Sequence, residues 1–124
     1  MTVADKLLPS EDSGRARLGT DAESLRRSYL HHIAFTQAKV AGYATKNDRY
    51  MALAMAVRDR MIDRWLATRN VYYANPDLKR VYYLSLEFLI GRTLGNALIN
   101  LNLYDACYDA IREAGDDLED LREL

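Results

Sequence analysis

Residues 80–96, R-V-Y-Y-L-S-L-E-F-L-I-G-R-T-L-G-N, decide the fold that this sequence predicts. The apolar residues from 81 to 90 are too continuous for a strand with one buried face, and such runs are typical of strands covered on both faces. The glycine at 91 and the residues after it indicate a tight turn followed by a helix. We therefore expect one core strand near 80–86 that leads into a helix.

No other stretch of the chain has comparable strand character. A buried strand needs neighbouring strands, because unpaired backbone N–H and C=O groups are costly to bury. The sequence therefore predicts an incomplete domain. It is either a piece of a larger α/β protein or a helical module that binds a partner through the edge of its single strand. Burial of the strand on both faces favours the larger protein.

Composition restricts the class of protein. The chain has 124 residues, a formal charge of −1 and one cysteine, Cys107. This length allows one modest core, and the balanced charge provides no basic stripe for nucleic acid. No apolar run is long enough to cross a membrane. One cysteine excludes an internal disulfide and agrees with a reducing compartment, so we expect a cytoplasmic protein that binds neither nucleic acid nor membrane.

The N-terminal third of the chain predicts an arm and a helix. Residues 1–19 are polar and are interrupted by proline and glycine, so we expect a flexible arm. Thr20 and Glu23 fit a capping box for a helix that ends near Gln37. The apolar stripe of this helix is predicted to comprise Leu25, Tyr29, Ile33 and Thr36.

Further helices are predicted along the rest of the chain. A second cap at Thr45 precedes a long helix over about 47–71. Shorter helices are expected over 94–102 and 104–114, the second of them ended by Gly115 in the manner of a C-cap. A short acidic helix is expected near 116–124. The buried stripe of the long helix is predicted to comprise Tyr50, Ala54, Val57, Met61 and Trp65.

Two pairs of basic residues have both a structural and a functional interpretation. His31 and His32 are adjacent, so their side chains point about 100° apart on a helix, which favours a structural pair over a metal site. Arg60 and Arg64 lie one helical turn apart and repel each other unless an anion lies between them. Either a neighbouring carboxylate or a phosphate-bearing ligand would satisfy that requirement.

Glu87 and Arg92 lie at the carboxyl end of the expected strand. Ligands bind outside the carboxyl ends of the strands in open α/β sheets. A carboxylate within an apolar run is also costly to bury without a partner. These residues therefore either form a buried pair that fixes the loop or support an active site.

The stretch Y-Y-L-S-L-E-F-L-I-G-R-T-L-G-N at 82–96 resembles the first core strand of the α-glucan phosphorylases, the family of glycogen, starch and maltodextrin phosphorylases. The likeness continues in S-Y-L-H-H-I-A-F-T at 28–36 and in A-M-A-V-R-D-R-M-I-D-R-W at 54–65. It covers about 20–124, which would then be a mostly α-helical, incomplete regulatory part of the enzyme's N-terminal domain. For the whole protein the resemblance implies a Rossmann-like α/β fold of glycosyltransferase type B architecture.

The resemblance also implies an activity. Phosphorylases of this family use inorganic phosphate to release α-D-glucose 1-phosphate from α-1,4-glucan ends, and they hold pyridoxal 5′-phosphate through a lysine. None of the four lysines here lies in such a motif, so this segment alone is expected to be inactive. The resemblance implies a homodimer, assigns Glu87 and Arg92 to support of the active site, and places Leu89 near the cofactor.

A second implication concerns regulation. In the animal enzymes the end of the long helix forms part of an AMP site, and Tyr73 and Arg69 fall at its positions here. The linker positions that match the family's capping aspartate and asparagine are Val40 and Gly42, which supply neither a carboxylate nor a side-chain amide. The resemblance therefore implies an effector surface at Tyr73 and Arg69 without identifying AMP as its ligand.

Overall fold

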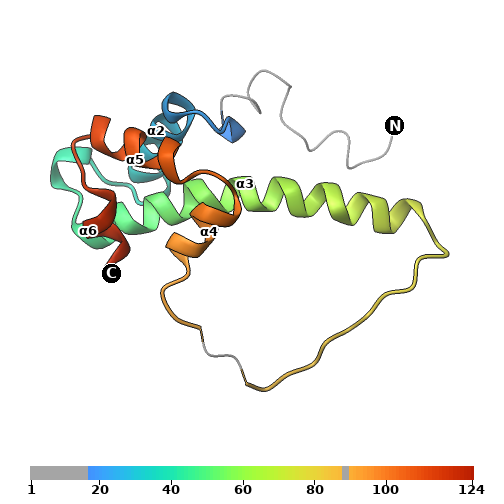
Figure 1. Cartoon of the computed structure of the whole chain (residues 1–124). Helices are drawn as coiled ribbons and strands as arrows, with labels where there is room; N and C mark the ends of the chain where they lie inside the picture. Colours follow the sequence, from blue (N-terminus) through green and yellow to red (C-terminus); the bar gives the residue numbers. More distant parts are fainter. Residues whose placement is uncertain (1–16, 88–89) are drawn as a thin grey trace.

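The computed structural model describes residues 17–87 and 90–124, so most of the expected arm, residues 1–16, lies outside the described part. The other helices gather around the N-terminal half of α3, and the C-terminal half of α3 projects beyond them (Figure 1). The elements, in chain order, are α2 (Ala22–His31), the π-helix η2 (His32–Thr36), the 3-10 helix η3 (Ala41–Tyr43), α3 (Lys46–Ala74), α4 (Leu94–Asn100), α5 (Tyr104–Glu113) and α6 (Leu118–Arg122).

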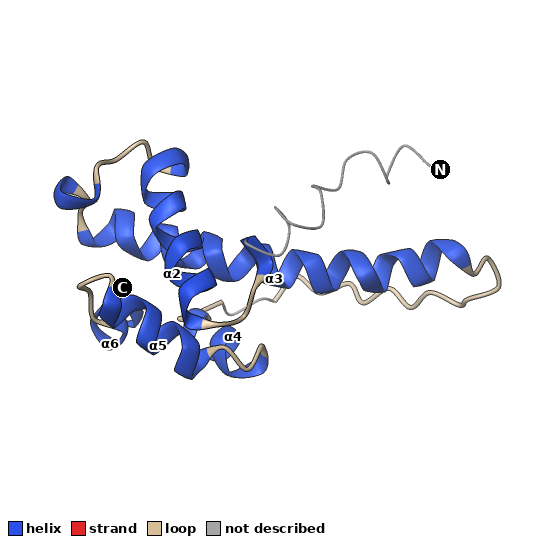
Figure 2. Ribbon diagram, turned by 90° about the horizontal axis from the view of Figure 1, so that it is seen from above, coloured by secondary structure: helices blue, strands red, loops and turns tan. Residues whose placement is uncertain are grey.

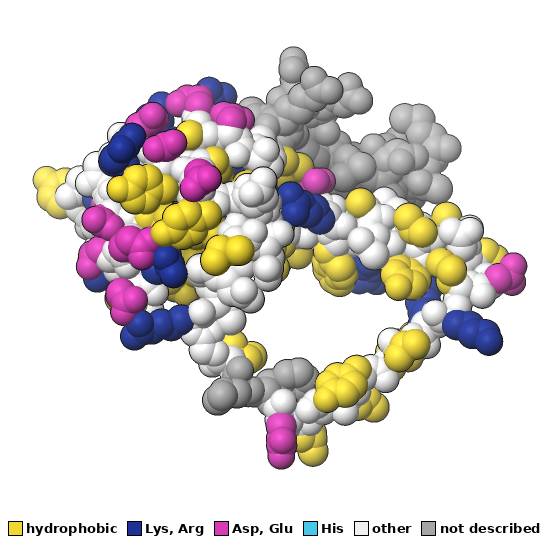
Figure 3. All heavy atoms as spheres, in the orientation of Figure 1, with side chains coloured by type: hydrophobic (Ala, Val, Ile, Leu, Met, Phe, Trp, Pro, Cys, Tyr) yellow, Lys and Arg dark blue, Asp and Glu magenta, His cyan; other side chains and the backbone are white. Residues whose placement is uncertain are grey.

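The expected strand near 80–86 is wrong for this chain. The described residues contain helices and loops but no strand (Figure 2). Val81 and Leu84 are 94% and 92% exposed on the extended segment that lies between α3 and α4 (Figure 3). A strand forms only where neighbouring strands pair with its backbone groups, and residues 17–87 and 90–124 supply none. The apolar run therefore predicts extended backbone but cannot create a sheet.

One hydrophobic core joins the helices. Helix α2 packs against α5 and α3, while α4 and α6 close the remaining sides. The segments before and after the extended region thus share one core, although more than thirty residues separate them in sequence. Its most completely buried large side chains are Leu25, Tyr29, Ile33, Leu53, Val57, Leu98, Leu103, Cys107, Ile111 and Leu118.

Helix α2 begins one residue later than predicted. Asp21, and not Thr20, is the N-cap, and its Oδ1 accepts a hydrogen bond of 2.9 Å from the Ser24 N–H. The hydroxyl and N–H of Ser24 lower the pKa of the Asp21 carboxyl, because both donate to its charged form. Aspartate and threonine both suit this position, so the two neighbouring candidates cannot be separated by residue type alone.

The helical path continues through η2, which confirms the predicted end near Gln37. Leu25, Tyr29 and Ile33 are buried as predicted, whereas Thr36 is exposed. The π-helix explains this difference. Its wider turn shifts the angular position of the last residues, so a 3.6-residue period no longer places Thr36 on the buried face.

Helix α3 has the predicted cap but a different buried stripe. Thr45 and Asp48 form a complete capping box, as expected. Of the predicted stripe only Val57 is buried: Tyr50 and Ala54 are half-buried, and Met61 and Trp65 are 47% and 51% exposed. The core ends beyond Val57 because the neighbouring helices cover only the first half of α3. The buried residues of α3 are Ala52, Leu53, Ala56, Val57 and Arg60.

The last three helices follow the predicted order. Helix α4 ends before Asn102, whose φ of 55° is incompatible with the expected extension of the helix. Gly115 is confirmed as the residue that ends α5. Its φ is 87°, and the N–H groups of Gly115 and Asp116 close a Schellman motif on Arg112 and Ile111.

Ala38 offers a test of backbone strain in the connection between η2 and η3. Its φ of 52° lies in the left-handed region, which costs an L-residue about 1–2 kcal/mol. Glycine avoids this cost but loses about 0.5–1 kcal/mol through its greater freedom in the unfolded chain. We expect Ala38→Gly to raise the free energy of unfolding by about 0.5 kcal/mol in urea titrations. Ala41→Gly, at a residue without positive φ, should lower it instead.

Candidate functional site

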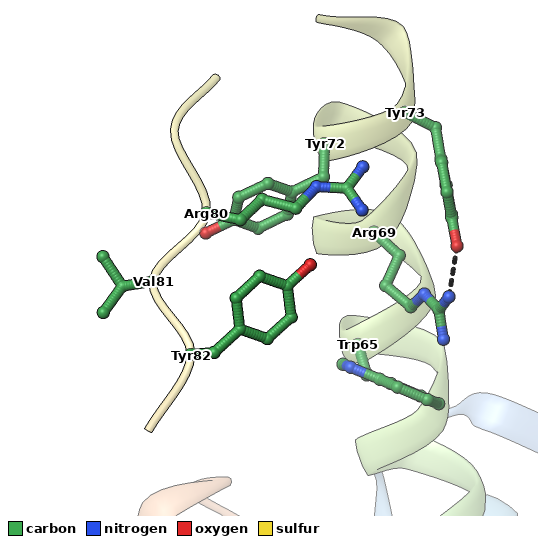
Figure 4. A pocket seen from close by; sticks show the side chains of 7 residues that line it. All are labelled: Trp65, Arg69, Tyr72, Tyr73, Arg80, Val81 and Tyr82. Carbon is green, nitrogen blue, oxygen red and sulfur yellow. Dashed lines mark hydrogen bonds between the residues drawn. The ribbon is translucent and has the colours of Figure 1, made fainter. Parts of the chain in front are cut away.

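Arginine and aromatic side chains gather where the C-terminal end of α3 faces the extended segment (Figure 4). They surround a pocket of about 290 Å³. Its lining combines one face of the projecting half of α3 with three consecutive residues of the segment. The lining residues are Trp65, Arg69, Tyr72, Tyr73, Arg80, Val81 and Tyr82.

Helical spacing builds one wall of this pocket. Trp65, Arg69 and Tyr73 follow one another at intervals of four residues, so they lie on one face of α3. The Arg69 guanidinium carbon lies 4.9 Å from the centre of the Trp65 ring and 5.3 Å from that of Tyr73. Arg69 also donates a hydrogen bond to the Tyr73 hydroxyl. The three side chains therefore form one continuous stack.

The extended segment supplies the opposite wall. The guanidinium carbon of Arg80 lies 5.5 Å from the centre of the Tyr73 ring, and Tyr82 lines the same pocket. As the structure describes it, this lining contains two guanidinium groups and no carboxylate. Guanidinium groups donate paired hydrogen bonds to phosphate or carboxylate oxygens, and exposed aromatic faces accept a stacked ring. The chemistry suits an anionic ligand.

The structure brings together the two predicted effector residues, Tyr73 and Arg69. Sequence reasoning did not include Trp65, Arg80 or Tyr82 in this site. The four-residue spacing could have found Trp65. Arg80 and Tyr82 have no such signal, because their placement depends on how the extended segment runs beside α3.

Glu87 and Arg92 do not form the buried pair considered from the sequence. Arg92 instead forms an exposed ion pair with Glu123, after α6. Glu87 is exposed, and its N–H donates a hydrogen bond of 3.1 Å to the hydroxyl of the nearby Ser85. The segment is not enclosed by neighbouring strands, so no low-dielectric surroundings force the two charges together. Their assignment to active-site support stays a prediction, and Leu89 lies outside the described residues.

His32 has a structural role. It is buried, its Nδ1 lies 2.8 Å from the Thr36 hydroxyl, and its Nε2 lies 3.1 Å from the Asp59 carboxylate. Both ring nitrogens are therefore engaged by side chains, while His31 is exposed. Within residues 17–87 and 90–124, no three potential metal-binding side chains converge.

Backbone carbonyls, rather than an acidic side chain, accept the hydrogen bonds of Arg60 and Arg64. Arg60 is 3% exposed and donates to the Gly19 carbonyl at 2.7 and 2.9 Å and to the Ala56 carbonyl at 2.6 Å. Arg64 donates to the Leu101 carbonyl at 3.2 Å. The carboxylate partner expected from the sequence is therefore wrong for both residues, and burial leaves the Arg60 side chain no access to a ligand. The two side chains point to different partners.

Cys107 is a core residue on α5. It is fully buried, and burial raises the pKa of its thiol to about 11. A free thiol of pKa 8.5 is about a quarter ionised at pH 8, against about 0.1% for a pKa of 11. We expect iodoacetamide to alkylate the native chain at least 100-fold more slowly than the chain in denaturing urea. Equal rates, followed by mass spectrometry, would show that the thiol is accessible.

The chain is similar to glycogen phosphorylases along most of its length. It is 50% identical over 111 residues to the brain form from Bos taurus and 45% identical over 124 residues to the brain form from Homo sapiens. It is also 49% identical over 100 residues to the human liver form. These alignments cover 90%, 100% and 81% of this chain.

The same alignments cover only a small part of the relatives. The chain spans 13%, 14% and 12% of the bovine brain, human brain and human liver proteins. No family model matches the chain. In the described residues, no helix combines the length and apolar character needed to cross a membrane. The chain is a homologue of the glycogen phosphorylases and corresponds to a short segment of them.

Proposed function

We propose that this chain is the N-terminal segment of an α-glucan phosphorylase. The complete enzyme would use inorganic phosphate to release α-D-glucose 1-phosphate from the ends of α-1,4-glucans, as a cytoplasmic homodimer. The observation that carries this proposal is the identity of 45–50% to glycogen phosphorylases over 81–100% of the chain. The same family assignment supports pyridoxal 5′-phosphate as the cofactor of the complete enzyme.

The described lysines do not fit a cofactor site. A lysine that forms a Schiff base must lose its proton, and carboxylate partners oppose that loss. Lys46 Nζ lies 2.7 Å from the Asp120 carboxylate, and Lys39 Nζ lies 3.9 Å from that of Asp48. Lys79 lies on the exposed segment. We therefore assign no cofactor attachment to these three residues and derive no catalytic step from this segment.

The enzymatic proposal is tested by comparing two proteins. One is the 124-residue chain, and the other is the product of the longest reading frame that contains its coding sequence. Release of glucose 1-phosphate from maltoheptaose and inorganic phosphate is measured for both. We expect activity only in the longer product. Activity of the short chain, or a longer product that binds pyridoxal phosphate but lacks phosphorolysis, would contradict the proposal.

We also propose that the pocket at the end of α3 binds a phosphorylated effector. The supporting observation is the stack of Arg69 between Trp65 and Tyr73, with Arg80 on the opposite side. Trp65 is the one tryptophan of the chain, so its fluorescence reports on this pocket. The probes are AMP, glucose 6-phosphate and inorganic phosphate.

Binding is followed as a change in Trp65 fluorescence. We expect Arg69→Ala to weaken binding by about tenfold or more, since a hydrogen bond to a charged group contributes about 1.5–3 kcal/mol. Arg58→Ala is the matched control, because Arg58 is an exposed arginine of α3 that does not line the pocket. Equal affinities of the two variants, or no response to any probe, would contradict this assignment.

A non-catalytic helical module that binds a partner is the competing proposal. It is favoured by the common core of the helices and by the exposed apolar segment at 81–86. The two proposals differ in what covers residues 81–86: a separate partner protein, or the rest of the same enzyme. A module should bind its partner through 81–86 reversibly, whereas the enzyme segment should be protected from proteolysis only within the longer product.

A further inference from the structure

The residues that precede α2 are held against α3 at two points. The Arg17 Nε donates to the Asp59 carboxylate at 2.8 Å, and the Arg60 guanidinium donates twice to the Gly19 carbonyl. Gly19 also lies so close to α2 that an added Cβ would be 2.4 Å from the Ser24 hydroxyl oxygen. These contacts make residues 17–19 a strap across the packed helices.

One carboxylate oxygen connects this strap to His32. The Oδ2 atom of Asp59 accepts from Arg17 and lies 3.1 Å from Nε2 of His32. The two nitrogens are thus within about 6 Å of each other by the geometry of their shared oxygen. Asp59 and His32 are largely buried, with side chains 14% and 5% exposed, whereas that of Arg17 is 54% exposed.

We propose that protonation of His32 weakens the attachment of the strap, residues 17–19, to Asp59. A neutral imidazole donates its Nε2 hydrogen to Asp59 and accepts the Thr36 hydroxyl hydrogen at Nδ1. A protonated imidazole brings a positive charge to the oxygen that Arg17 uses. The imidazolium of His32 and the guanidinium of Arg17 then repel each other and compete for the one carboxylate of Asp59. Each cation therefore weakens the contact of the other with Asp59.

Histidine is the side chain whose charge ordinarily changes between pH 5 and 8, and the other ionisable groups around Asp59 keep their charge state in that range. Hydrogen bonds from Arg17 and His32 outweigh the effect of burial and hold the pKa of Asp59 below its usual range. Arg60 interacts with Asp59, Asp21 and Cys107. The pKa of Asp21 is lowered, so it stays ionised, and the buried Cys107 thiol stays neutral. The exposed His31 also faces His32, with 5.9 Å between the ring centres.

Trypsin cleavage of the Arg17–Leu18 bond in the full chain tests the proposal. The cleavage rate is measured at pH 7.5 and 5.8 and divided by that of a peptide with the same residues 12–24, which removes the pH dependence of trypsin itself. We expect the normalised rate of the unmodified chain to rise about two- to fivefold at pH 5.8, the range of a partly exposed ion pair. His32→Gln should abolish this rise.

Two further variants supply a control and a second, independent test of the proposal. His31→Gln is the matched control and should show the same rise as the unmodified chain. Asp59→Asn should cleave faster at both pH values and show no further rise, and this result is required even if His32→Gln fails to fold. A constant rate in the unmodified chain, or a rise that persists in Asp59→Asn, would overturn the proposal.

Discussion

Replacement of Leu53 by alanine is expected to lower the free energy of unfolding by about 3–4 kcal/mol. Leu53 lies on α3, is 1% exposed, and belongs to the core that α3 shares with the surrounding helices. The substitution removes buried methyl groups and leaves a cavity that the neighbouring helices can close only in part. A domain of this size is stable by about 5–15 kcal/mol, so the change removes a large fraction of the total.

Urea unfolding followed by far-ultraviolet circular dichroism measures this effect. Leu66→Ala is the matched control, because Leu66 lies on the same helix and is 43% exposed. We expect the control to lower the free energy of unfolding by less than about 1 kcal/mol, because the Leu66 side chain is only partly buried and little apolar area is lost. If both substitutions had equal effects, the first half of α3 could not be the centre of the core.

Asp116→Ala is expected to lower the free energy of unfolding by about 3 kcal/mol. The Oδ2 atom of Asp116 accepts from the Tyr29 hydroxyl at 2.7 Å and from Arg49 Nη1 at 2.5 Å. Tyr29 is 1% exposed, and burial together with this hydrogen bond raises the pKa of its hydroxyl. Loss of the carboxylate leaves a buried hydroxyl and a partly buried guanidinium without their acceptor.

Two other substitutions separate the contributions to this network. Tyr29→Phe removes one hydrogen bond and keeps the ring, so about 1 kcal/mol is expected. Asp120→Ala is the control for loss of an acidic residue, because the Lys46–Asp120 pair is exposed and should contribute less than about 1 kcal/mol. An effect of Asp116→Ala no larger than that of Asp120→Ala would show that the network is not buried in solution.

Local sequence determined the helices and most of their ends. Thr45 and Asp48 predict the start of α3 because a capping box uses only neighbouring residues, and Gly115 predicts the end of α5 for the same reason. The exchange of Thr20 for Asp21 as the cap of α2 shows the limit of this reasoning. When two adjacent residues can both cap a helix, the path of the preceding chain decides which of them does so.

Tertiary structure decided the outcomes that depend on distant residues. The run at 81–86 is apolar enough for a buried strand, yet it stays exposed because backbone pairing needs other strands. Met61 and Trp65 have core spacing but lie beyond the helices that could cover them. The same projection of α3 creates the pocket, since it leaves a helix face open to Arg80.

The sequence by itself therefore determined the helix order, the N-cap of α3, the end of α5, the apolar stripe of α2 and the likeness to phosphorylases. Each depends on residues close together in the chain or on direct comparison of residues. Only the tertiary structure decided that Arg60 binds the Gly19 carbonyl and that Asp116 joins Tyr29 to Arg49. It also decided that Arg17 and His32 contact the same carboxylate oxygen of Asp59. Periodicity shows which face of a helix is apolar, but a polar contact depends on which distant atom packs against that face.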